Sequence, residues 1–158
     1  MSIRRTALLL LLMLLCLALS GCAAPKVETL QKTCAELADQ VQAAAEFREL
    51  TEMNEKHLEK YLLIDAADLE DWAMRRDASR NTAEMILVVK VKAGADQASV
   101  KKVLESYLTE LRNVNGNYQP SEAYKLDSAQ VLENGAYLAM IVSPDAKKTS
   151  AALGSGWK

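Results

Sequence analysis

Glu84-Met-Ile-Leu-Val-Val-Lys-Val-Lys92 is the clearest β-strand in this 158-residue chain. Successive side chains of a strand point to opposite faces of its sheet. One face is apolar throughout, and its residues are Met85, Leu87, Val89 and Val91. Ile86 and Val88 bring apolar side chains to the other face as well. We therefore expect other parts of the protein to cover both faces of this strand.

The residues that follow predict a long amphipathic helix from Asp96 to about Val114. Asp96 is a favourable N-cap residue, and Asn115-Gly116 predicts the C-terminal end of the helix. Apolar residues recur in between at steps of three and four, which places them on one stripe: Val100, Val103, Leu104, Tyr107, Leu108, Leu111 and Val114. A stripe of this kind has to be buried, so we expect the helix to pack on the sheet.

Two hairpins make up the predicted sheet. Leu69 to Arg76 alternates with a period of two and is predicted to be the strand before Glu84–Lys92. Residues 129–133 and 137–142 form the second pair, joined by Asn134-Gly135, whose residues tolerate the positive φ of a tight turn. The pattern predicts an α+β fold with an antiparallel four-stranded sheet, packed by the long helix.

Shorter helices are predicted at both ends of the domain. Ser143 is the expected cap of the last helix, and Gly154 is its expected end. A single domain is therefore predicted over residues 27–153, followed by a flexible tail at residues 154–158 in which Trp157 frays. The predicted helices besides the long one cover residues 26–47, 54–63, 121–126 and 144–154.

The first residues of the chain have the pattern of an export signal. Arg4 and Arg5 precede an unbroken apolar run from Ala7 to Leu19. This run is too short to span a bilayer comfortably, because a membrane helix needs about 20 apolar residues. The four residues Leu19-Ser20-Gly21-Cys22 resemble the lipobox of bacterial lipoproteins.

The lipobox resemblance implies that Cys22 is joined to a diacylglyceryl group and that a signal peptidase cuts after Gly21, with Leu19 and Ser20 completing the cleavage motif. We accordingly predict a signal peptide at residues 1–21, a lipidated tether at residues 22–26, and a domain anchored to membrane lipid outside the cytoplasm. Acyl chains anchor a protein firmly when two are present. The alternative is an ordinary secretory signal or an uncleaved anchor.

Composition after cleavage narrows the class of protein. Residues 22–158 contain 17 basic and 21 acidic side chains, without a clustered positive surface, which argues against a nucleic-acid partner. Cys16 leaves with the signal and Cys22 carries lipid, so Cys34 has no partner in its own chain. We interpret Cys34 as a small buried apolar residue, with an intermolecular disulfide or a redox sensor as the alternative.

An acidic run gives the only catalytic or metal-binding hypotheses. Asp65, Asp68 and Asp71 lie within Ile64–Asp71, and oxygen ligands for a divalent metal are one interpretation. Calcium loops need regular spacing around a glycine, which the run lacks, so turn-forming aspartates are favoured. The same carboxylates are the acid and base of an alternative function, a cell-envelope hydrolase.

Other polar residues are interpreted as surface features. His57, the only histidine, lies among charged residues and is predicted to be exposed rather than catalytic. Arg75, Arg76 and Arg80 are predicted to be a solvated loop, with an anion site as the alternative. Motifs for a phosphate loop, a zinc protease, a redox pair or a serine hydrolase are absent, so we predict no cofactor.

Several segments in order resemble the domain-of-unknown-function family numbered 4358, which consists of small lipoproteins, chiefly of Gram-positive bacteria. The segments are residues 57–65, 83–90, 118–120 with Lys125-Leu126, 134–137 and 143–145. The likeness extends from about Lys26 to Leu153. It implies a surface lipoprotein and supplies no catalytic residues. We expect a non-catalytic binding or protein-interaction module, with an envelope protein or a wall component as its partner.

Overall fold

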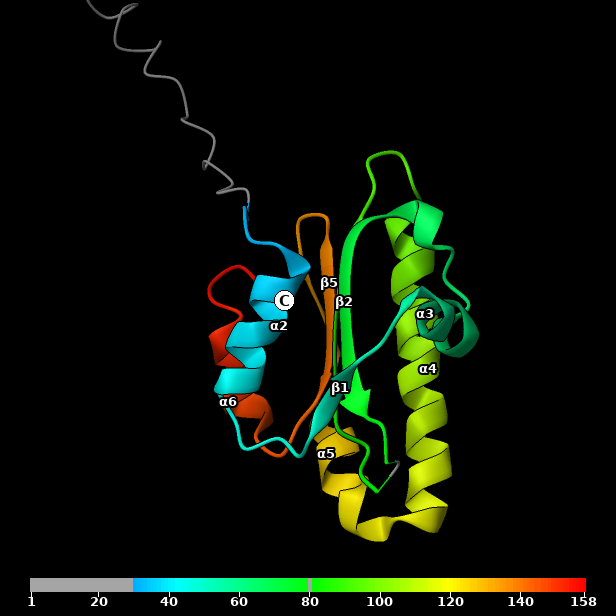
Figure 1. Cartoon of the computed structure of the whole chain (residues 1–158), viewed down its shortest axis with the longest axis vertical. Coiled ribbons are helices and arrows are strands. Elements are labelled where there is room, and N and C mark those ends of the chain that lie inside the picture. The colour runs from blue at the N-terminus through cyan, green and yellow to red at the C-terminus, as the bar shows by residue number, and fades with distance from the viewer. Residues whose placement is uncertain (1–29, 80) are drawn as a thin grey trace, which may run out of the picture.

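The structure, a computed structural model, describes residues 30–79 and 81–158. In this part of the chain, five strands form one antiparallel sheet in the order β1-β2-β3-β5-β4 (Figure 1). β3 lies at the centre, which agrees with its apolar residues on both faces. The strands are β1 (Leu50–Glu52), β2 (Leu69–Asp77), β3 (Met85–Val91), β4 (Val131–Asn134) and β5 (Tyr137–Val142).

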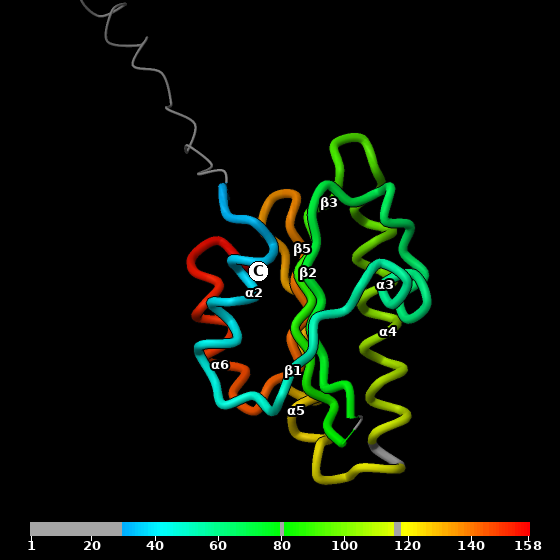
Figure 2. Tube along the Cα trace, in the orientation of Figure 1, coloured from blue at the N-terminus to red at the C-terminus, as the bar shows by residue number. Residues whose placement is uncertain are grey.

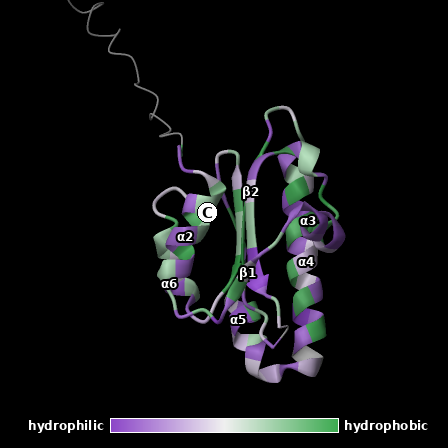
Figure 3. Cartoon of the chain, viewed as in Figure 1, coloured by the Kyte–Doolittle hydropathy of each residue, from purple (hydrophilic) through white to green (hydrophobic). Residues whose placement is uncertain are grey.

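Helices cover both faces of the sheet, so the domain has three layers. Helices α3 and α4 lie on one face, α5 closes the lower end of that layer, and α2 and α6 lie on the other face (Figures 1 and 2). Hydrophobic residues concentrate in the sheet, whereas the helices alternate between hydrophobic and hydrophilic residues (Figure 3). The helices are α2 (Cys34–Ala43), α3 (Glu55–Leu62), α4 (Gln97–Tyr118), α5 (Ala123–Ser128) and α6 (Ala146–Ala152).

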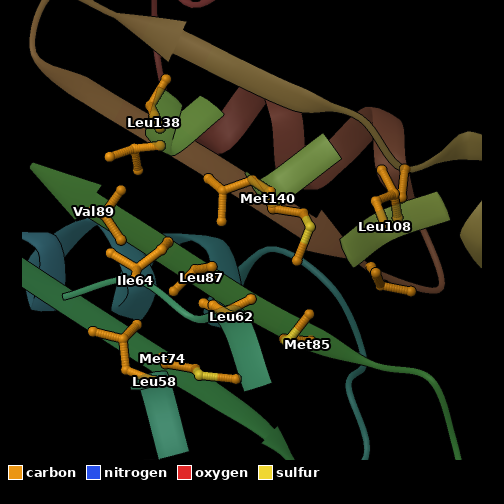
Figure 4. Close-up of a cluster of buried hydrophobic side chains, with 14 of the residues drawn as sticks. Leu58, Leu62, Ile64, Met74, Met85, Leu87, Val89, Leu108, Leu138 and Met140 are labelled. Carbon is orange, nitrogen blue, oxygen red and sulfur yellow. The ribbon is translucent and has the colours of Figure 1, made fainter. Parts of the chain in front are cut away.

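Two separate cores follow from the alternation along β3. Leu87 and Val89 pack with Leu108 of α4 in the first core, which α3 also lines (Figure 4). Ile86 and Val88 pack in the second core, under α2 and α6. Burying one such aliphatic side chain contributes about 1.5–3 kcal/mol. The prediction that both faces of this strand are covered is confirmed.

The predicted four-stranded sheet lacks β1, which the structure adds at the edge beside β2. β1 pairs Leu50 with Asp77 and Glu52 with Arg75. It is only three residues long, too short to show an alternating pattern, and two of its side chains are exposed. Its position depends on pairing with β2 and on an ion pair between Arg75 and Glu52 at 3.2 Å, both of which are tertiary contacts.

The N-terminal helix begins later than predicted. It starts at Cys34 rather than Lys26 and ends at Ala43, and residues 26–29 of the predicted helix lie outside the described residues. Thr33 is the N-cap: its Oγ1 accepts from the Glu36 N–H at 3.1 Å, and the Glu36 carboxylate accepts from the Thr33 N–H at 2.7 Å. This capping box fixes the start of the helix.

The long helix ends later than predicted, because α4 continues through Asn115-Gly116 to Tyr118. Proline disfavours helical backbone in the residue before it, and Gln119 before Pro120 has φ −141° and ψ 69°. The proline therefore ends this helix, and the glycine lies inside it. A 3₁₀ turn, Pro120–Glu122, then leads into α5.

The C-terminal residues contact the sheet, in contrast to the flexible tail predicted for residues 154–158. Lys158 and Glu133 exchange two backbone hydrogen bonds, of 2.9 and 3.1 Å. The Trp157 indole N–H donates to the Leu153 carbonyl at 3.1 Å, and its ring meets Tyr137 edge-on at 6.5 Å. The last helix is capped by Asp145, not by Ser143 as predicted.

Candidate functional site

The predicted lipid-attachment residues Leu19, Ser20, Gly21 and Cys22 lie outside the described residues. The first described residue, Leu30, borders a broad hollow of about 960 Å³ that Gly154, Gly156 and Lys158 also line. The N-terminal and C-terminal ends of the domain therefore meet at one end of the second helical layer (Figure 2). Within the described ranges, none of the helices is both long enough and apolar enough to cross a membrane.

The carboxylates of the acidic run serve different local contacts. Asp65 accepts from the Ala67 N–H at 2.8 Å and caps a 3₁₀ turn. Asp71 accepts from the Cys34 N–H at 2.7 Å, which holds the first residue of α2 against β2. Glu70 pairs with Lys90 at 2.6 Å. Among residues 30–79 and 81–158, groups of three or more metal-ligating side chains in a suitable arrangement are not found.

Cys34 is buried in the second core, as predicted. Burial raises the pKa of its thiol well above the ordinary range, and the nearby Asp71 carboxylate raises it further. The thiol is therefore protonated and shielded from solvent. A thiolate is the form that attacks a disulfide, so the intermolecular disulfide does not fit this environment.

His57 and the arginines have structural contacts. A ring nitrogen of His57 lies 2.7 Å from the Asn54 side-chain oxygen, in the first turn of α3. Arg75 points to the α2 face of the sheet, where it pairs with Asp39 at 2.8 Å. Arg76 is the next residue of β2 and points to the opposite face, so these two arginines do not converge on an anion. Arg80 lies outside the described residues.

A buried ionic cluster was not predicted. Lys125 Nζ lies 2.8 Å from a Glu84 oxygen and 2.9 Å from a Glu122 oxygen, and all three side chains are nearly inaccessible. The carboxylates also accept backbone N–H groups, from Arg48 at 2.6 Å and from Ala83 at 3.0 Å. Burial opposes the charge of Lys125, but hydrogen bonds to both glutamates outweigh it and raise its pKa. The cluster joins α5 to the start of β3.

The outer side of α3 and α4 carries unusually exposed apolar side chains. Leu63 is 85% exposed, Tyr118 is 83% exposed and Val114 is 49% exposed. Leu63 also has a left-handed backbone, with φ 55°, a region that glycine usually occupies after a helix. Scattered exposed apolar residues are normal, but these three line two adjacent hollows.

The first hollow, which we call the Arg76 cleft, has a volume of about 260 Å³ and lies between the C-terminal half of α4 and the β2–β3 connection. The second, the Leu63 cleft, has about 310 Å³ and lies between α3 and the N-terminal half of α4. Tyr107 lines both. The Arg76 cleft is lined mainly by Arg76, Thr82, Tyr107, Leu111, Val114 and Tyr118, and the Leu63 cleft by Tyr61, Leu63, Lys102, Val103, Tyr107 and Glu110.

Arg76 is held by aromatic contact rather than by an ion pair. Its guanidinium carbon lies 4.6 Å from the centre of the Tyr61 ring, a cation–π contact. Within the described ranges, carboxylates at ion-pair distance from Arg76 are absent. Burial raises the pKa of the neighbouring Tyr107 above its ordinary value, so that the phenol is neutral. A half-buried positive charge therefore lies in a cleft whose α4 side is formed mainly by Tyr107, Leu111, Val114 and Tyr118.

These clefts escape prediction because their residues come from separate elements. In the sequence, the exposed Tyr118 follows the apolar stripe of the helix, and Arg76 belongs to a cluster of arginines. Only the packing of β2 against α4 brings them to one hollow. The arginine cluster of the sequence did not indicate the clefts, because Arg75 and Arg76 point to opposite faces of the sheet and Arg80 lies outside the described residues.

Comparison with known proteins gives one assignment. A search of curated proteins found no match, and a search of solved structures found none either. The model of one protein family, described as a domain of unknown function (DUF4358), matches residues 43–143. This range is well over half of the chain and runs from the end of α2 to the end of β5. The chain therefore belongs to the DUF4358 family.

Proposed function

We propose that the protein is a lipoprotein, anchored through Cys22 outside the cytoplasm, whose domain is a non-catalytic binding module. The anchor is supported by the lipobox-like sequence at residues 19–22. Leu30 lies eight positions after Cys22, and an extended chain covers about 3.3–3.6 Å per residue. The domain would then stay within about 30 Å of the lipid surface.

The exposed apolar residues around the two clefts are the observation that carries the binding role. Exposing Leu63, Val114 and Tyr118 to water gains nothing for the isolated domain, because their apolar surface remains hydrated. A ligand that covers them removes this surface from water and leaves the cores undisturbed. In the acidic run, Asp65 and Asp71 accept backbone amides and Glu70 pairs with a lysine, and none of these three lines either cleft.

Two measurements on the anchor test the first half of the proposal. Mass spectrometry of the native product is expected to find a chain that starts at a diacylglyceryl-modified Cys22. A Cys22→Ser variant is expected to leave the membrane fraction, since it has no sulfur for the thioether. An unmodified N-terminus, or a Cys22→Ser protein that still sediments with membranes, would contradict lipid anchoring.

Photo-crosslinking in cells tests the binding role. A photoreactive residue at position 63 or 118 is expected to give reproducible adducts of defined mass. The matched control is position 147, which is exposed on α6 at the opposite face of the sheet. Adducts that are equally abundant at all three positions, or absent from positions 63 and 118, would contradict a binding surface on the α3–α4 side.

A further inference from the structure

The Arg76 cleft combines one charge with apolar walls. Arg76 lines the cleft, and its guanidinium lies over the ring of Tyr61, which lines the neighbouring Leu63 cleft. Within the described residues, its charge has no carboxylate partner at ion-pair distance. Leu111, Val114 and Tyr118 supply an apolar wall from α4. An unpaired charge in apolar surroundings is costly, because burial removes water without providing an opposite charge. A ligand with a negative charge and an apolar body would satisfy both features.

The acidic residues near the cleft do not neutralise Arg76. Glu84 lines the cleft, but its carboxylate is bound by Lys125 and by the Arg48 N–H. Glu110 lines the neighbouring Leu63 cleft instead. Arg76 is therefore the group available to a negative ligand, and guanidinium recognises a carboxylate through two parallel hydrogen bonds.

The size and charge of the cleft restrict which ligands can bind in it. An apolar cavity of about 150 Å³ holds benzene, so about 260 Å³ accommodates a ring with a short chain. One guanidinium balances a single negative charge. A phosphate monoester carries almost two charges at neutral pH, and the second would remain unbalanced in this protein of net negative charge. A monocarboxylate is the better match.

We propose that the Arg76 cleft binds a small carboxylic acid with an aromatic or branched apolar body. The carboxylate pairs with Arg76, and the apolar body lies between Tyr107, Leu111 and Tyr118. This inference rests on the proposed binding role of the α3–α4 side but not on the lipid anchor. It adds a ligand class and a residue that recognises the charge.

Calorimetry with a matched pair of probes tests the inference. The full chain, isolated in lipid nanodiscs, is titrated with 3-phenylpropionate and with 3-phenylpropanamide, which has nearly the same shape but no charge. We expect the acid to bind at least about tenfold more tightly, since a charge-assisted hydrogen bond is worth more than a neutral one. Empty nanodiscs correct for partition into lipid. Hydrogen exchange is expected to slow in residues 107–118 when the acid is bound.

Variants locate the effect within the cleft. Arg76→Gln is expected to remove the preference for the acid over the amide, while Lys147→Gln, which lowers the net charge equally at a distant exposed site, leaves it intact. Tyr118→Ala is expected to weaken the binding of both probes, because it removes an apolar side chain that lines the cleft. Tyr124→Ala is its control: Tyr124 is 56% exposed on α5, outside the cleft.

Several outcomes would overturn the inference. These are equal affinity for acid and amide, absence of binding at millimolar concentration, tighter binding of phenyl phosphate than of the acid, or protection that maps away from α4. The acid–amide comparison needs only the wild-type chain, so it stands even where Arg76→Gln fails to fold. Crosslinks at positions 63 or 118 without acid binding would remove the inference and leave the proposed binding role in place.

Discussion

Lys125 Nζ lies 2.8 Å from Glu84 Oε1, although the two residues are 41 positions apart in the chain. The pair joins α5 to the residue immediately before β3. Glu122 brings a second carboxylate to the same lysine. Two carboxylates share one ammonium group in a nearly solvent-free site. Such a site tolerates removal of the lysine poorly, because two negative charges then face each other without water.

Lys125→Met is therefore expected to lower the free energy of unfolding by about 3–5 kcal/mol, the cost of breaking a buried ion pair by removing one partner. Methionine keeps the length and the apolar part of the side chain, so the effect reports the charge. Urea denaturation measures it. Lys147→Met, at an exposed position of α6, is the control and should change stability by less than about 0.5 kcal/mol. A loss below about 1 kcal/mol for Lys125→Met would mean that the cluster is not energetically coupled.

The lowered pKa of Asp77 predicts that the free energy of unfolding decreases at acid pH. Burial on its own would raise the pKa of this carboxyl, but hydrogen bonds from Ser79 and Thr82, at 2.6 to 2.9 Å, lower it below the ordinary value. A folded-state pKa below the unfolded value stabilises the protein above the unfolded pKa of about 3.9. This stabilisation is lost as the pH falls through the folded-state pKa.

The difference in unfolding free energy between wild type and Asp77→Asn is thus expected to be about 1–3 kcal/mol at pH 7 and to shrink as the pH falls below about 4. Urea titrations at a series of pH values measure it. A gap that stays constant down to pH 2, or that widens, would show that the charge of Asp77 is not what the Ser79 and Thr82 hydrogen bonds stabilise.

Cys34 is expected to resist thiol reagents in the folded protein. Its side chain is fully buried, and the raised pKa keeps it in the unreactive thiol form. A maleimide should label it only after denaturation, with one equivalent per lipidated chain because the sulfur of Cys22 is then blocked. Labelling of the native protein on the time scale of a model thiol would contradict the burial of Cys34 and restore the intermolecular disulfide as an interpretation.

Sequence patterns predicted the parts of the fold that repeat along the chain. The strand around Val88 and the helix around Leu108 were recognised because each shows its own period over many residues. β1 shows no such pattern, since Leu50, Thr51 and Glu52 make only three positions, and two are exposed. Two helix ends were predicted wrongly because one local feature decides each of them. The capping box at Thr33 sets the start of α2, and the proline after Gln119 sets the end of α4.

Prediction of the candidate site was limited for a different reason. The lipobox-like motif is local, so four adjacent residues suffice to recognise it. The ionic cluster and the Arg76 cleft are made by residues far apart in the chain, and their charged members each have, alone, the pattern of a solvated surface. Lys125 is such a case: in the sequence it resembles any helical lysine, and only the packing of α5 on the sheet buries it.

Leu63 combines a left-handed backbone, which is unfavourable for a leucine, with a side chain that is largely exposed to water. It is the C-cap of α3, with φ 55°, a conformation that costs a residue with a Cβ about 1–2 kcal/mol. Its side chain, 85% exposed, recovers little of that cost by burial. Leu63→Gly is therefore expected to leave the free energy of unfolding unchanged or to raise it by up to about 1 kcal/mol, since relief of strain is offset by the greater freedom of the unfolded chain.

The same substitution should reduce crosslinking at position 118, because both side chains belong to the surface proposed to bind a ligand. Leu62→Ala, one residue earlier, is the contrasting variant, because Leu62 is 2% exposed and packs in the first core. This substitution should lower the free energy of unfolding by about 2–5 kcal/mol. A stable Leu63→Gly protein with weaker adducts would mean that the strained leucine is retained for binding. If Leu63→Gly loses stability and crosslinks as before, then Leu63 has a structural role in the fold instead.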